Sequence, residues 1–126
     1  MLPEPKTEQS RRLWRTKFVA AFRGLRLGIK GHSSFFVHFF MSALVLATAT
    51  VLKCELWQWC VLLICISSVL GAELFNSAIE TLFRGLDDEI KQHTWPALDV
   101  AAGAVLLISL FAAMIGGMIF TSRLLG

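Results

Sequence analysis

The sequence predicts an all-α membrane protein with an N-terminal amphipathic surface helix and three transmembrane helices. Three observations lead to this fold class. Hydrophobic residues make up 56% of a chain of only 126 residues, three long apolar runs follow one another, and a basic stretch precedes the first run. A small soluble domain buries about 60% of the surface of its unfolded chain, which is too little to hide this much apolar surface. Lipid is therefore expected to cover part of the chain.

The N-terminal part is expected to lie on the membrane rather than in it. Residues 1–10 carry two prolines and several charges without apolar periodicity, which predicts a flexible tail. Over residues 11–31, apolar side chains recur every three or four positions among arginines and lysines. This pattern predicts a helix in the membrane interface, with its basic side toward anionic headgroups. A soluble amphipathic helix is the alternative, but the transmembrane run that follows favours the interface.

The apolar runs predict transmembrane helices at about 35–52, 56–83 and 97–121. A helix needs about 20 residues to cross the hydrocarbon core. The second run is longer than that, so its last turns are expected to emerge into a polar interface. In the third run, Gly103, Gly116 and Gly117 are expected to allow close contacts between helices. Residues 11–126 are expected to form one domain.

The charge distribution predicts the orientation of the chain. Eight of the twelve lysines and arginines precede the first span, so the N-terminus is expected on the cytoplasmic side. The link over residues 84–96 is then cytoplasmic too, and a soluble ligand would arrive there. The chain lacks a phosphate-binding loop and a His-Glu-x-x-His metal motif, so any chemistry must come from scattered residues. A nucleic-acid partner is not expected.

One polar stripe interrupts the second run. Glu73, Asn76 and Glu80 are three and four residues apart, which places them on one face of a helix. A carboxylate in the centre of a membrane helix costs about 2.5 to 3.5 kcal/mol, so a partner is expected, and a metal cation is the simplest. Glu80 can also pair with Arg84, whereas Glu73 lacks such a neighbour and suits a general base. The alternative is a stripe that is solvated or pairs with arginines of the surface helix.

Asp99 and two histidines leave alternatives open. Asp99 follows Pro96 by three residues, where it could bind free backbone N–H groups or face the stripe. His32 precedes the first span, as a metal ligand or a solvated side chain. His38 lies inside that span and is expected to form a hydrogen bond between helices.

The octet from Glu73 to Glu80, ELFNSAIE, closely resembles the signature of the small bacterial membrane kinases that phosphorylate diacylglycerol or undecaprenol. The Gly24-Leu25-Arg26 element and the start of the third span at Asp99 also resemble that family. The resemblance covers nearly the whole chain beyond Arg11. It implies a domain-interlocked homotrimer in the bacterial cytoplasmic membrane, with active sites between subunits at the cytoplasmic surface.

The resemblance also implies a reaction, the transfer of the γ-phosphate of ATP to a membrane lipid alcohol with Mg²⁺ as cofactor. Glu73 would be the general base on the lipid hydroxyl. Asn76 would help to hold the site, and Glu80 would bind the magnesium ion and the nucleotide. Phosphoryl transfer requires positioning, charge neutralisation by a metal and a base near the acceptor, and these residue types meet those requirements.

The remaining implied site residues lie outside the stripe. Glu89 and Asp99 would lie on the nucleotide side. Phe22 and Arg26 of the surface helix would contact the lipid substrate. His32 stands where the family commonly has a second metal-binding glutamate, and it would be a softer substitute for a magnesium ligand.

The chain departs from the family pattern at further positions. Arg84 replaces an aspartate, Leu98 replaces a lysine, and Ile90-Lys91 replaces an aromatic-histidine pair. These changes have two interpretations: the charge that neutralises phosphate has moved within one site, or the chain is a catalytically impaired relative that acts as a membrane scaffold or lipid-binding protein. The acceptor, diacylglycerol or undecaprenol, stays open at this point.

Overall fold

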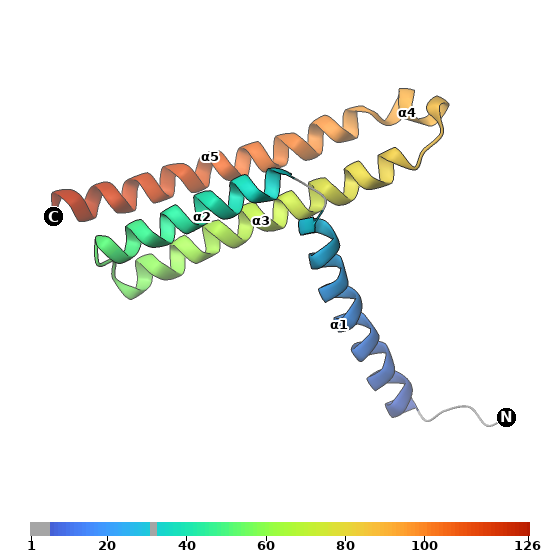
Figure 1. The fold of residues 1–126 in the computed structure, drawn as a ribbon, viewed down its shortest axis with the longest axis horizontal. Coiled ribbons are helices and arrows are strands. Elements are labelled where there is room, and N and C mark those ends of the chain that lie inside the picture. The colour runs from blue at the N-terminus through green and yellow to red at the C-terminus, as the bar shows by residue number, and fades with distance from the viewer. Residues whose placement is uncertain (1–5, 31–32) are drawn as a thin grey trace. The chain divides into compact units, whose positions relative to one another are not determined.

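The computed structural model describes residues 6–30 and 33–126, which form helices and their short connections. The helices in the described part are α1 (Lys6–Lys30), α2 (Ser33–Val51), α3 (Leu56–Arg84), α4 (Asp88–Thr94) and α5 (Pro96–Leu125) (Figure 1). The contacts divide the chain into two compact units, Met1–Gly31 and His32–Gly126, where the sequence predicts one domain over 11–126. The first unit holds α1, and the second holds the other four helices.

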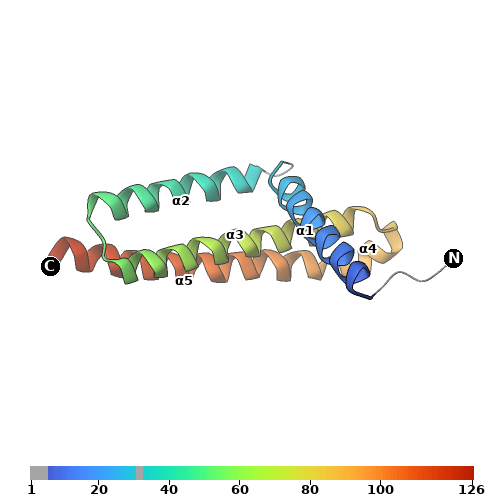
Figure 2. The ribbon, with the colours of Figure 1, turned by 90° about the horizontal axis from the view of Figure 1, so that it is seen from below.

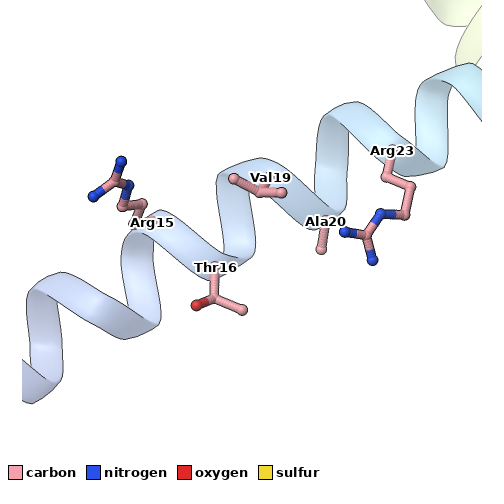
Figure 3. Close-up of a pocket in the computed structure, with 5 residues that line it drawn as sticks. All are labelled: Arg15, Thr16, Val19, Ala20 and Arg23. Carbon is pink, nitrogen blue, oxygen red and sulfur yellow. The ribbon is translucent and has the colours of Figure 1, made fainter.

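Helix α1 begins earlier than the sequence predicts. It starts at Lys6, so residues 6–10, expected to belong to a flexible tail, are helical. Its large apolar side chains, such as Trp14 and Phe22, are exposed within the unit. Figure 3 shows a shallow hollow on α1 between Arg15 and Arg23, and all the residues that line it belong to this one helix. The hollow is therefore a surface feature of a single helix.

Three described helices are long and apolar enough to cross a membrane, as the sequence predicts. They are α2, α3 and α5, which contain 19, 29 and 30 residues. Their bounds differ from the expected spans by at most four residues at any end. Helix α3 packs most extensively against α5, and α2 runs antiparallel beside the first part of α3, with its N-terminal end near the middle of α3 (Figure 2).

A tight turn joins α2 to α3 and is tied to the end of α5. Lys53 adopts a left-handed backbone conformation with φ of 52°, which is uncommon for a residue other than glycine. Arg123 of α5 donates hydrogen bonds to the carbonyl oxygens of Leu52 at 3.3 Å and Lys53 at 2.6 Å. At the start of α3, the backbone N–H of Glu55 donates to Gln58 Oε1 at 2.9 Å, as in a capping box. These hydrogen bonds therefore fix the turn between α2 and α3 to the start of α3 and the end of α5.

Helix α4 lies in the link over residues 84–96, for which the sequence predicts no helix or strand. Its seven residues follow Asp87, and Asp88 and Glu89 lie in its first turn, where the helix dipole favours acidic side chains. Pro96 then begins α5, at a position where its missing N–H costs nothing. Seven residues without an apolar period carry too weak a signal for sequence analysis to detect this helix.

The core of the second unit is thin. Ala49, Leu62 and Ile119 are buried together, one from each long helix. Most of the other large apolar side chains on these helices are exposed, Phe36 and Leu106 among them. Exposed apolar surface of this extent on helices of spanning length indicates that lipid or other protein surface covers it.

Candidate active site

The polar stripe of α3 lies mostly inside the second unit. Glu73 and Asn76 are 4% and 8% exposed, and the adjacent Ser77 is 3% exposed. Asn76 Nδ2 donates a hydrogen bond to Glu80 Oε1 at 3.1 Å, which confirms that the stripe shares one face of the helix. The alternative interpretation, in which water solvates the stripe, therefore does not hold for Glu73.

Two side chains of α2 hold the two carboxylate oxygens of Glu73. Ser34 Oγ donates to Oε1 at 2.6 Å. His38 Nε2 lies 3.5 Å from Oε2, so His38 reaches a side chain of another helix, but at ion-pair distance and not in the expected hydrogen bond. Ser34 and His38 are four residues apart and therefore lie on one face of α2. Sequence analysis missed the role of Ser34, although this spacing from His38 was available as a signal.

Glu80 lies at the end of the stripe near the α3–α4 link. Its Oε2 lies 3.9 Å from a terminal guanidinium nitrogen of Arg84, so the expected pair between positions four residues apart is confirmed. The Arg84 side chain is 70% exposed, which limits such a pair to about 0.5 kcal/mol. Its main consequence is not stability but position, because the pair places a cationic side chain beside a carboxylate that could bind a metal.

The stripe also contains buried polar atoms without a hydrogen-bond partner among the described residues. They are Asn76 Oδ1 and Ser77 Oγ. Magnesium binds carboxylate and carbonyl oxygens and is commonly held by one or two protein ligands together with substrate phosphates. The carboxylate of Glu80 and the amide oxygen of Asn76 fit that donor set. Within the described residues there is no group of three or more histidine, cysteine, aspartate or glutamate side chains that could hold a metal alone.

The remaining predicted site residues lie outside the stripe. Glu89 in α4 and Asp99 in the first turn of α5 are exposed and form no hydrogen bond or ion pair within the described parts of the chain. Asp99 therefore does not cap α5 through its side chain. Phe22 and Arg26 lie exposed on α1, in the other unit. His32 lies outside the described residues.

A cavity of about 450 Å³ lies between α2, α3 and α5. Apolar side chains form most of its wall, with His38, Ser42 and Ser109 as polar exceptions. His38 therefore lies between this cavity and Glu73, although Glu73 itself is not part of the cavity wall. The mostly apolar lining suits an apolar ligand.

The glycines of α5 have open space around them within this chain. Gly116 and Gly117 line this cavity, and a Cβ atom built on either glycine, or on Gly103, would meet no heavy atom within 4 Å. The expected close helix contacts are therefore not made within the described chain. The small size of Gly116 and Gly117 instead leaves the cavity open.

The chain matches a known protein family over most of its length. Residues 19–120 match the family model described as prokaryotic diacylglycerol kinase. The matched region contains the entire stripe, the cavity and the C-terminal part of α1. No curated protein and no solved structure matches the chain.

Proposed function

This chain belongs to the prokaryotic diacylglycerol kinase family, and on that premise we propose that it transfers the γ-phosphate of ATP to the hydroxyl of a membrane lipid. The observation that carries the proposal is the buried carboxylate of Glu73, which contacts His38, a residue that lines an apolar cavity between the three long helices. A lipid whose chain occupies the cavity would present its hydroxyl near this carboxylate. The acceptor is diacylglycerol or undecaprenol.

Glu73 serves as the general base in this proposal. Phosphoryl transfer needs a group that accepts the proton of the attacking hydroxyl as the new bond to phosphorus forms. A base must come within about 3 Å of that proton's oxygen. Support for this role comes from His38, which lines the cavity and lies 3.5 Å from Oε2 of Glu73.

Asn76 and Glu80 hold a magnesium ion that accompanies ATP. Mg²⁺ supplies neutralisation of the negative charge that spreads over the phosphate oxygens. The hydrogen bond from Asn76 Nδ2 to Glu80 Oε1 orients both side chains and directs the amide oxygen of Asn76 away from that bond. Arg84 adds a planar cationic group that suits phosphate oxygens, in place of the lysine that the family usually has at Leu98. His32 is a second proposed metal ligand.

The proposal also includes the arrangement in the membrane. The protein acts as a homotrimer in the bacterial cytoplasmic membrane, with the N-terminus and the site on the cytoplasmic side. Glu89 and Asp99 line the nucleotide, and Phe22 and Arg26 of α1 contact the lipid. The basic residues of α1 support attachment to anionic headgroups.

A phosphotransfer assay tests the proposal. Purified protein in lipid vesicles is given labelled ATP, Mg²⁺ and, separately, diacylglycerol or undecaprenol, and labelled lipid is measured. The intact protein is expected to label one of them, and Glu73→Gln is expected to lower kcat at least about 100-fold because the base is lost. Glu55→Gln removes a carboxylate from the other end of α3 and is the matched control. A Glu73→Gln protein as active as the control would rule out Glu73 as the base.

A second candidate function is a membrane scaffold or lipid-binding protein without kinase activity. The changes at His32, Arg84 and Leu98 favour it, as does the lack of a complete metal-ligand group within the described residues. Nucleotide binding separates the two functions. If the protein in lipid binds neither ATP nor magnesium-ATP at millimolar concentration, the scaffold is correct.

A further inference from the structure

The carboxylate of Glu73 is held from both sides by one neighbouring helix. Ser34 Oγ donates to Oε1 at 2.6 Å, a short hydrogen bond between two oxygen atoms. His38 Nε2 lies 3.5 Å from Oε2, in ion-pair range but at the outer limit for a hydrogen bond. The two oxygens of Glu73 are therefore engaged unequally, with Oε1 tightly held and Oε2 loosely held.

The hairpin makes this contact possible. Ser34 lies 19 residues before Lys53, and Glu73 lies 20 residues after it. Because both helices rise by about 1.5 Å per residue from the turn, the two side chains reach the same height in the bundle. The next turn of α2 brings His38 to the same carboxylate.

His38 also connects Glu73 with the cavity. It is the side chain of α2 that both lines the cavity and approaches Oε2. A lipid hydroxyl that arrives from the cavity would therefore meet Oε2 beside His38, whereas Oε1 is already occupied by Ser34. The loose contact at Oε2 leaves this oxygen able to accept another hydrogen bond.

We propose that Ser34 and His38 are positioning residues for Glu73: Ser34 fixes Oε1 and so sets the orientation of the carboxylate, and His38 keeps Oε2 directed toward the cavity. The inference rests on the proposed function, in which Glu73 is the base. Neither side chain receives the proton or touches ATP. They hold the base in its reactive position, because a small misplacement of the base would lower the rate strongly.

Kinetics of single variants provide the first test. Ser34→Ala is expected to lower kcat about 10- to 100-fold, with the KM for ATP unchanged, because the nucleotide does not contact Ser34. Ser34→Thr keeps the hydroxyl and is expected to recover most of the activity. His38→Gln keeps a nitrogen donor and should retain more activity than His38→Phe. Thr50→Ala, which removes an exposed hydroxyl from the far end of α2, is the matched control and should behave like the unchanged protein.

A double variant separates positioning from a structural role. In a Glu73→Gln protein, adding Ser34→Ala should cause little further loss of the residual activity, because the group that Ser34 orients is already gone. Losses that simply multiply would assign Ser34 a role elsewhere and overturn the proposal. The proposal would also be overturned if the unchanged protein is active and the Ser34→Ala and His38→Phe variants keep kcat within twofold of the Thr50→Ala control. An unchanged protein that phosphorylates no lipid alcohol would refute the proposed function itself, and the positioning role with it.

Discussion

Arg123 is predicted to stabilise the fold from the end of the chain opposite the stripe. Its guanidinium donates to the carbonyl oxygens of Leu52 and Lys53, at 3.3 and 2.6 Å, and lies 3.9 Å from the carboxylate of Glu55. Arg123→Ala removes all three interactions and leaves two turn carbonyls without these donors. A hydrogen bond to a charged group contributes about 1.5 to 3 kcal/mol. The Leu52 bond is long and the Glu55 side chain is 61% exposed, so we expect a total loss of about 2 kcal/mol.

The free energy of unfolding measures this effect. The protein in mild detergent micelles is unfolded with a denaturing detergent and followed by circular dichroism. Glu55→Gln is the matched control: it loses the exposed ion pair with Arg123 and weakens the exposed hydrogen bond from Trp57 Nε1, so its free energy of unfolding should fall by less than about 1 kcal/mol. Arg123→Lys keeps the charge and one donor and should lie between the two. An Arg123→Ala protein within about 0.5 kcal/mol of the original would show that water replaces these donors without cost, which would refute the reasoning.

Three further changes have expected outcomes. Lys53→Gly relieves a left-handed backbone conformation at φ 52° and should raise the free energy of unfolding by about 1 kcal/mol, measured in the same titration. Gly117→Leu places a side chain in the cavity without meeting a heavy atom at Cβ, so it should raise the KM for the lipid but not for ATP in initial-rate measurements. Glu80→Gln should raise the Mg²⁺ concentration for half-maximal activity about tenfold or more, measured by magnesium titration, whereas the control Glu55→Gln should leave it unchanged.

The polar stripe could be predicted from the sequence alone because its spacing needs no knowledge of the other helices. Glu73, Asn76 and Glu80 share a face of any α-helix, and the pairing of Glu80 with Arg84 follows from a separation of four residues. The partner of Glu73 could not be derived in this way. Ser34 lies 39 residues away, and only the register of the hairpin brings it to the carboxylate.

The cavity and the role of the glycines also required the packed helices. Sequence analysis predicts that Gly116 and Gly117 permit close helix contact, because small residues usually do so in membranes. In the structure they line the space that α2, α3 and α5 leave between them. The path of the neighbouring helix decides whether a glycine is packed against that helix or faces a cavity. The local sequence carries no information on that path.

The sequence by itself determined the three spans and the residues available for chemistry. The length of an apolar run and the spacing of residues on a helix are local properties, and a lipid bilayer requires any chain that crosses it to satisfy its backbone hydrogen bonds over that length. Only the tertiary structure decided which of those residues meet. A turn at Lys53, tied down by Arg123, sets the height at which α2 lies beside α3, and that height places Ser34 and His38 on the carboxylate of Glu73.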